Sequence, residues 1–178
     1  MPLLRDADHD VVGMTRSPEK AERLRELGAE PVVCDVYDSE ALRQAVVAAR
    51  PDLVMHQLTD LPDEMKRLAL YMRRNNRIRN QGTRNLLAAA RAADAKRFIA
   101  QSIAFRPPGV RRAVARHERM VLDADGLVLR YGWFYGPGTY SGTIGRVPSP
   151  RIHVDEAASR TVELLDAPSG VVVIAEEE

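Results

Sequence analysis

The sequence predicts an α/β fold built on a doubly wound parallel sheet. Short segments rich in Val, Ile and Leu alternate with segments of helical periodicity along the whole chain. The apolar segments lack regular polar alternation, as is typical of parallel strands that helices cover on both faces. Repeated alternation of this kind implies right-handed crossovers between neighbouring parallel strands.

Six short apolar segments are the expected strands, and they are residues 10–15, 30–36, 52–58, 97–104, 127–134 and 170–175.

The segments between them have readable helix ends. Ser17-Pro18 begins the first helix with an N-cap and a proline, and Gly28 ends it. Asp38 or Ser39 caps the second helix, which ends before Pro51. Residues 62–93 predict two helices that break near Asn75-Asn76, and two more helices are expected at about 109–123 and 154–165.

Length and charge limit the class of protein. The 178 residues predict one domain, 1–178, with 45% apolar and 29% charged residues, as in ordinary globular proteins. A net charge of +1 gives no reason to expect nucleic acid or an anionic membrane as a partner. Because no apolar run is long enough to span a bilayer and no signal-like segment begins the chain, we expect a cytoplasmic protein.

Cysteine and histidine usage argues against a metal site. Cys34 is the single cysteine, which excludes an internal disulfide and fits a reducing compartment. His9, His56, His117 and His153 are scattered without the spacing of metal ligands. We therefore expect no metal, a buried strand thiol at Cys34 and a core role for His56.

Thr15, Arg16 and Ser17 follow the first expected strand. In a doubly wound dinucleotide-binding fold this position faces the adenosine ribose, where an acidic residue suits NAD and an arginine suits the 2′-phosphate of NADP. A guanidinium pairs with phosphate through two parallel hydrogen bonds, and Ser17 adds a hydroxyl. The alternative is that Arg16 is a solvent-exposed loop residue near a helix start without a role in binding. NADP is thus favoured over NAD as the cofactor.

Asp35 and Val36 end the second expected strand, at the edge where open α/β sheets bind ligands. An aspartate there can accept from an adenine amino group while Val36 packs on the ring. The equally supported alternative is that Asp35 is an acidic residue that precedes a helix and has no role in binding.

Four stretches resemble the short-chain dehydrogenase/reductase superfamily, in its extended or atypical NAD(P)-dependent epimerase/dehydratase branch. They are residues 52–59 (DLVMHQLT), 81–90 (QGTRNLLAAA), 97–104 (RFIAQSIA) and 129–138 (LRYGWFYGPG) followed by 152–158 (IHVDEAA). The resemblance implies a Rossmann-like NAD(P)-binding domain of oxidoreductase or epimerase type. It also implies that the strand end at Leu58 and Thr59 passes beside the cofactor ribose.

The catalytic motif of that superfamily is altered. Its tyrosine and lysine, four residues apart, have no counterpart here, because no Y-x-x-x-K occurs in the sequence. When the chain is aligned on Glu118, these two positions fall on Val110 and Val114, which share an apolar helix face with Val121.

The remaining catalytic positions are altered as well. The usual serine position falls on Ile103, one residue after Ser102, and Arg79 stands where an asparagine is frequent. Ser102 and Tyr135 remain as catalytic candidates, with Tyr131 and Tyr140 as further possible proton donors. The segments after Phe105 and between residues 138 and 152 are short, so a reduced C-terminal substrate region is expected.

The glycine-rich loop that binds the phosphates in dinucleotide-binding folds also has no counterpart in the sequence. No G-x-G-x-x-G occurs, and the expected first strand of the fold has no counterpart in residues 1–10, which suit a helix remnant and a turn. In the order 3-2-1-4-5-6 that strand is central. We therefore expect an incomplete sheet, in which its two neighbours either pair directly or are covered by another chain, for example in a homo-oligomer.

Three functions remain open from the sequence. The first is an NADP- or NAD-dependent reductase or epimerase with an unusual site, acting on a small molecule. The second is a non-catalytic relative that binds a dinucleotide weakly or acts as an interaction module. The third is a truncated form of a longer enzyme of the epimerase/dehydratase type.

Overall fold

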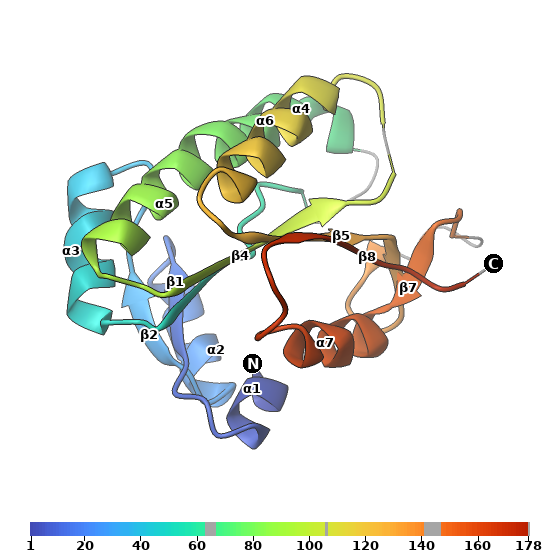
Figure 1. Ribbon diagram of the computed structural model, residues 1–178. Helices are drawn as coiled ribbons and strands as arrows, with labels where there is room; N and C mark the ends of the chain where they lie inside the picture. The colour runs from blue at the N-terminus through green and yellow to red at the C-terminus, as the bar shows by residue number, and fades with distance from the viewer. Residues whose placement is uncertain (63–66, 106, 141–146, 178) are drawn as a thin grey trace.

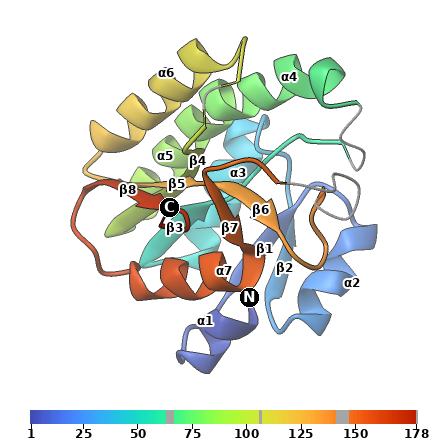
Figure 2. The same ribbon diagram turned by 90° about the vertical axis from the view of Figure 1, so that its right-hand side faces the viewer.

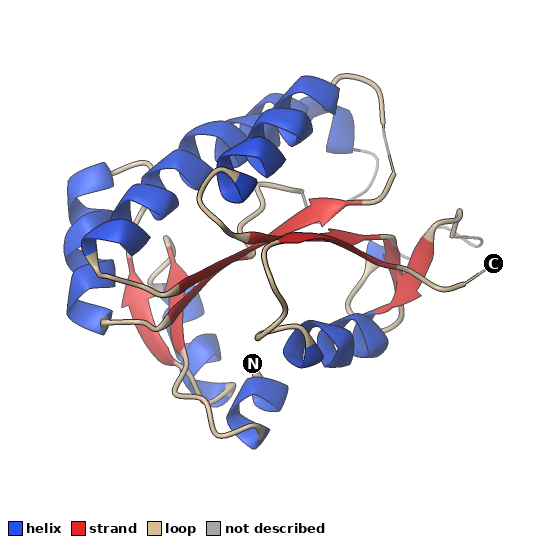
Figure 3. Cartoon of the chain, viewed as in Figure 1, coloured by secondary structure: helices blue, strands red, loops and turns tan. Residues whose placement is uncertain are grey.

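Parallel strands lie between two layers of helices in the computed structural model, which describes residues 1–62, 67–105, 107–140 and 147–177 (Figures 1 and 3). The strands are β1 (Val12–Thr15), β2 (Glu30–Val33), β3 (Leu53–His56), β4 (Arg97–Ile103), β5 (Leu127–Tyr131), β6 (Trp133–Tyr135), β7 (Arg151–His153) and β8 (Gly170–Ile174).

The helices are α1 (Pro2–Asp6), α2 (Glu19–Glu26), α3 (Ser39–Ala49), α4 (Leu68–Arg77), the π-helical segment η2 (Ile78–Gly82), α5 (Thr83–Ala92), α6 (Arg111–Leu122) and α7 (Val154–Glu163). In Figure 1, α4, α5 and α6 lie above the strands, whereas α1, α2 and α7 lie below them. Figure 2 shows α1 next to α7, with which it is in contact.

The strands form three parallel groups. β1 pairs with β2, β3-β4-β5-β8 form a four-stranded sheet, and β6 pairs with β7. The predicted α/β class and parallel arrangement are confirmed, and so is the helix and turn over residues 1–8. Direct pairing of the two neighbours of the missing central strand, which are the expected strands 10–15 (β1) and 52–58 (β3), is wrong: these strands belong to separate sheets.

Two apolar cores lie on opposite faces of the four-stranded sheet. The upper core joins Cys34 and Leu42 to Leu86, Phe98 and Val128, so it spans both the β1-β2 pair and the larger sheet. The lower core packs the opposite faces of β4, β5 and β8 against α7. The upper core therefore joins the two strand groups through shared helices.

Local sequence signals explain the ends of several elements. Asp38, one of the two expected caps of α3, accepts a hydrogen bond from the Ala41 amide at 3.0 Å. Pro31 lies in β2, which pairs on one side only, so its missing N–H breaks no ladder.

The long helical stretch differs from its prediction. Instead of breaking near Asn75-Asn76, α4 passes through η2 into α5 without a gap. The two asparagines are tolerated because Asn75 accepts from the Asp60 amide at 3.1 Å and Asn76 donates to the Gly109 carbonyl at 3.1 Å. Residues 63–66 of this prediction lie outside the described residues.

The expected strand 127–134 is divided at Gly132. β5 ends at Tyr131 and β6 begins at Trp133, where the chain leaves the large sheet to pair with β7, a strand that the sequence did not predict. A Cβ at Gly132 would lie 2.8 Å from the Arg151 Cα, so only glycine permits this crossing.

No helix in the described ranges is long and apolar enough to cross a lipid bilayer.

The close approach of Gly132 to Arg151 leads to a test. Gly132→Ala should lower the free energy of unfolding by about 1–3 kcal/mol, because the new methyl group meets backbone atoms that have little room to move. Urea denaturation measures this change. Gly82→Ala is the matched control, since its Cβ would lie 3.6 Å from the nearest side-chain atom of Val36, an ordinary contact. Equal stability of the two variants would contradict this reason for the glycine.

Candidate functional site

An ion cluster joins the carboxyl ends of β1 and β3. Asp60 is 6% exposed, and its carboxylate lies 3.3 Å from Arg16 Nη2 and 3.1 Å from Arg74 Nε. The Arg16 side chain is 54% exposed, so much of its guanidinium remains accessible. One buried carboxylate thus orients two arginines toward the edge where the sequence predicts the adenosine ribose.

Local hydrogen bonds hold the residues on either side of Arg16. Thr15 Oγ1 accepts from the Ser17 amide at 3.2 Å, and the Ser17 hydroxyl donates to the Glu19 carboxylate. Leu58 packs on the upper core, while Thr59 is exposed just before Asp60. Thr15, Arg16 and Ser17 therefore share one turn.

The end of β2 lies near this cluster. The Asp35 carboxylate is exposed and accepts from the Tyr37 amide at 2.9 Å, whereas Val36 is buried and its carbonyl accepts from Asn85 Nδ2 at 2.8 Å. Asn85 belongs to the GTRNLL stretch of α5. It fixes the loop on which Asp35 and Val36 lie.

Tyr37 lies between the Asp60 ion cluster and the end of β2. The Arg77 guanidinium lies 3.8 Å from the centre of the Tyr37 ring, and the Tyr37 hydroxyl is buried without a hydrogen-bond partner among the described residues. Burial raises the pKa of Tyr37, and Arg77, Asp60 and Arg16 are close enough to influence it. An unpaired buried hydroxyl beside arginines suits a ligand with polar oxygen or nitrogen atoms.

Two buried histidines lie on either side of Thr83, behind the end of β3. Thr83 Oγ1 lies 3.1 Å from His56 Nε2 and 2.7 Å from His117 Nδ1, and the His117 Nε2 lies 2.9 Å from the Gln101 carbonyl. Burial lowers the pKa of His56 to about 3 and also lowers that of His117. The expected core role of His56 fits its 1% exposure.

Ser102 lies in a second buried polar group. Its hydroxyl donates to Glu118 Oε1 at 2.6 Å, and the Glu118 carboxylate accepts two hydrogen bonds from Arg130, at 2.8 and 2.6 Å. Burial opposes ionisation of Glu118, but the hydrogen bonds from Arg130 and Ser102 hold its pKa below the ordinary value. The hydrogen bonds of Glu118 to Ser102 and Arg130 thus connect α6 to β4 and β5.

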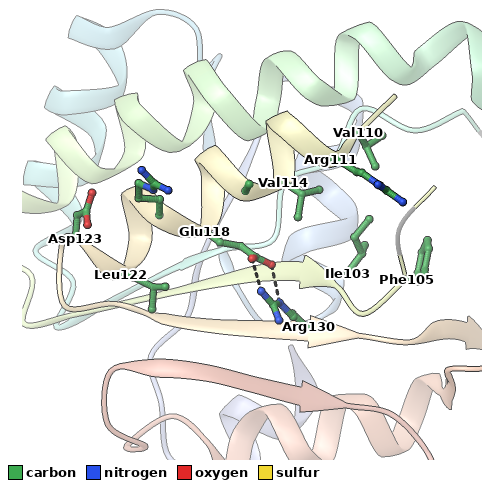
Figure 4. Close-up of a pocket in the computed structure, with 11 residues that line it drawn as sticks. Ile103, Phe105, Val110, Arg111, Val114, Glu118, Leu122, Asp123 and Arg130 are labelled. Carbon is green, nitrogen blue, oxygen red and sulfur yellow. Dashed lines mark hydrogen bonds and ion pairs between the residues drawn. The ribbon is translucent and has the colours of Figure 1, made fainter. Parts of the chain in front are cut away.

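A cavity of about 330 Å³ lies beside this ion pair, between α6 and the sheet (Figure 4). Ile103, Val110 and Val114, which occupy the expected serine, tyrosine and lysine positions, all line it together with Phe105. The structure therefore brings the three substituted positions together at one cavity. Its wall at these positions is apolar.

Tyr135 lies elsewhere, on β6. Its hydroxyl donates to the Glu176 carboxylate, which also accepts from Arg151 Nε at 2.9 Å. The hydrogen bond to Glu176 raises the pKa of Tyr135. Tyr131 bonds instead with Thr161, at 2.6 Å, so neither tyrosine shares a hydrogen-bond partner with Ser102.

Metal ligation and thiol chemistry receive no support from the described part of the chain. There, no group of three or more His, Cys, Asp or Glu side chains is placed to hold a metal ion. Cys34 is buried, and burial raises the pKa of its thiol.

The family follows from a comparison with known proteins. A family model described as NAD(P)H-binding matches residues 1–123. The chain belongs to the NAD(P)H-binding family. The expected NAD(P)-binding domain is therefore confirmed, and solved structures of sugar-nucleotide epimerases share its Rossmann-like fold.

A curated relative is 3-diazoavenalumate denitrifying reductase of a Streptomyces species, 36% identical over 213 aligned positions. The alignment covers 92% of this chain but 66% of the relative, so the chain spans slightly less than two thirds of that protein. Because the alignment is longer than the whole chain, the relative contains segments that this chain lacks.

Solved structures share the fold at low identity. UDP-glucose 4-epimerase of Thermus thermophilus, in complex with NAD, has a TM-score of 0.77 at 18% identity, covering 98% of this chain and 72% of that one. The UDP-Glc/GlcNAc 4-epimerase of Campylobacter jejuni has a TM-score of 0.76 at 14% identity, with 98% and 73% covered.

Sequence reasoning missed three residues of the candidate site. Asp60, Arg74 and Tyr37 carry no motif, and their roles depend on side chains that meet across the edge of the sheet. The position of Asp60, directly after the expected strand end at Leu58 and Thr59, is the one signal that pointed to it.

The buried histidines should make the protein less stable in mild acid. As the pH falls through about 6.5 the unfolded chain protonates at His56, whereas the folded chain does not until about pH 3, so protons favour unfolding. His56 alone should lower the free energy of unfolding by about 2 kcal/mol between pH 7 and pH 5. Urea denaturation at several pH values measures this.

His56→Gln should make that pH dependence visibly shallower, while the exposed His9→Gln should leave it unchanged. Identical pH profiles for the wild type and His56→Gln would show that the burial of this imidazole does not govern acid stability.

Proposed function

We propose that the protein binds NADP(H), in preference to NAD(H), along the edge formed by the ends of β1, β2 and β3. The observation that carries this is the accessible Arg16 guanidinium, held beside Arg74 by the buried Asp60. Two arginines around one carboxylate leave a net positive charge where a 2′-phosphate is expected.

The other residues of the edge fit the rest of the adenosine. Asp35 presents its carboxylate for the adenine amino group, Val36 supports the ring, and the exposed Thr59 lies where the ribose passes. The Tyr37 hydroxyl is a further unpaired polar group. Because the 178 residues contain no glycine-rich phosphate loop, we expect weak binding by the chain alone.

Of the reaction classes, we favour a reductase. A bound reduced nicotinamide supplies a hydride, and reduction of a carbonyl also needs a proton donor at the oxygen. The apolar Val110 and Val114 supply no such proton. Replacement of a diazonium group by hydrogen needs none, since the new C–H bond forms as N₂ leaves with the electrons of the C–N bond. The name of the Streptomyces relative describes a reductase of a diazo compound.

The cavity beneath α6 is the proposed substrate site. Its volume suits a small molecule, and Ile103, Phe105 and Val114 give it an apolar wall. In this proposal Ser102 acts on Glu118, which orients Arg130 at the cavity. For Tyr135 to act as a proton donor, its hydroxyl has to break its hydrogen bond to Glu176 and form one to the substrate.

A non-catalytic interaction module is the second candidate function. The observation in its favour is the pair of unpaired strand edges on β1 and β3.

Arg16→Glu should weaken NADPH binding at least tenfold and NADH binding less than about twofold, because the new carboxylate repels the 2′-phosphate that only NADPH carries. Titration followed by nucleotide fluorescence measures both affinities. Arg23→Glu, on the exposed face of α2, is the control and should change neither. Equal weakening for both nucleotides would contradict the NADP preference.

Tyr135→Phe separates the two reduction chemistries. Because the Tyr135 hydroxyl is bonded to Glu176 and does not line the cavity proposed for the substrate, the variant should reduce a diazonium substrate at the wild-type rate, and a loss of about a hundredfold on carbonyl substrates alone would contradict this placement of the substrate. Steady-state oxidation of NADPH with both substrate classes measures this. Binding of NADPH without turnover on either class would support the non-catalytic module instead.

A further inference from the structure

Arginines gather in the helix layer that covers the upper face of the sheet. The segments α4, η2, α5 and α6 contain ten arginines, three in α4, one in η2, two in α5 and four in α6. The one acidic residue of these segments is Glu118, which is buried and already paired with Arg130 of β5. The net charge of +1 of the whole chain therefore conceals a strongly positive layer.

Seven of these arginines are exposed, and their side chains form no ion pair or hydrogen bond with a described residue. They form the arginine surface: Arg73 of α4, Arg84 and Arg91 of α5, and Arg111, Arg112, Arg116 and Arg119 of α6. Other exposed helices neutralise their arginines internally. Arg23 of α2 lies 2.8 Å from Glu26, and Arg43 of α3 lies 2.7 Å from Glu40. The charge of the arginine surface lacks such compensation.

The arginine surface consists of two neighbouring rows. On α6, Arg112, Arg116 and Arg119 follow one another at the spacing of one helix face. The second row lies on the continuous helical stretch of α4, η2 and α5, and from Arg73 to Arg91 it is about 27 Å long at 1.5 Å per residue. Helix α6 contacts all three of these segments and lies alongside them (Figures 1 and 2). The cations are therefore spread over an extended surface.

Large apolar side chains are scarce on this surface. In the described parts of α4, η2, α5 and α6, Leu70 is the one large apolar or aromatic side chain that is exposed. Ala88 and Ala115 are among the exposed residues between the arginines. Protein interfaces and membrane-surface helices depend on large apolar anchors, and single-stranded nucleic acids stack their bases on aromatic rings. The arginine surface instead suits a partner that is held by charge.

We propose that the arginine surface binds the phosphate backbone of duplex DNA, without reading the base sequence. One strand of a duplex has a phosphate about every 3.4 Å, so about eight phosphates lie along the length of the longer row. Guanidinium groups pair with phosphate through two parallel hydrogen bonds. A second copy of the chain is not the partner of this surface, because two arginine surfaces would place like charges opposite each other.

Fluorescence anisotropy with a labelled DNA duplex of about 20 base pairs measures this binding. The duplex should bind at about 50 mM salt, and the logarithm of its affinity should fall linearly with the logarithm of the salt concentration, by about 0.9 for each phosphate neutralised. Because no dinucleotide is present, the result is independent of the proposed NADP binding.

Two triple variants with the same loss of charge test the location. Arg84→Gln, Arg112→Gln and Arg116→Gln together should weaken duplex binding at least about tenfold and reduce the salt slope by about two to three. The control combines Arg23→Gln, Arg25→Gln and Arg43→Gln on α2 and α3, and it should stay within about twofold of the wild type. All six side chains are exposed, so neither variant alters the core. Arg111 and Arg119 are left unchanged, because they line the proposed substrate cavity.

Equal weakening by the two triple variants would overturn the proposal, because net charge and not the arginine surface would then govern binding. Absence of duplex binding at about 50 mM salt would overturn it as well. Tighter binding of polyglutamate, of anionic lipid vesicles or of a DNA single strand of the same length would assign the surface to a different partner and would likewise contradict the proposal.

Discussion

The unpaired edges of β1 and β3 are the constraint on which the rest of this structure depends. Because these strands share no ladder in the part of the chain that the structure describes, side chains and helices join the β1-β2 pair to the four-stranded sheet. Leu42 of α3 and Leu86 of α5 connect the strand groups in the upper core, and the hydrogen bond from Asn85 to the Val36 carbonyl adds a polar link. Helix packing thus takes the place of main-chain pairing.

Buried polar groups link the larger sheet to the helices that cover it. Thr83 connects β3 to α6 through the two histidines, and Glu118 connects α6 to β4 and β5 through Ser102 and Arg130. Breaking a buried pair leaves an uncompensated charge or donor, so these links specify the position of α6 as well as supporting it. The position of α6 in turn sets the wall of the cavity.

The sequence predicted the elements whose signals are local. Asp38 and Pro51 gave α3 its limits, Gly28 gave the end of α2, and apolar runs located all the strands of the main sheets. Asn85, in the GTRNLL stretch, donates to the Val36 carbonyl and holds the loop of Asp35 and Val36, a contact that the sequence did not predict. Alignment on Glu118 located Val110 and Val114, two of the positions that meet at the cavity.

Features that depend on distant contacts were missed. The role of Asp60 requires arginines from β1 and α4 to meet, and η2 replaces a helix break because distant carbonyl and amide groups satisfy the asparagines. β7 forms because Gly132 lets the chain cross Arg151 closely. The separation of β1 from β3 depends on the packing of whole helices, which no short pattern encodes.

Amide hydrogen exchange of the chain alone tests the open edges most directly. Exchange rates should alternate along both strands: the amides of Met14, Leu53 and Met55 should exchange about a hundredfold faster than those of their ladder-bonded neighbours Gly13, Val54 and His56. Equally slow exchange of both sets would contradict it, because it would mean that the edges of β1 and β3 are already paired.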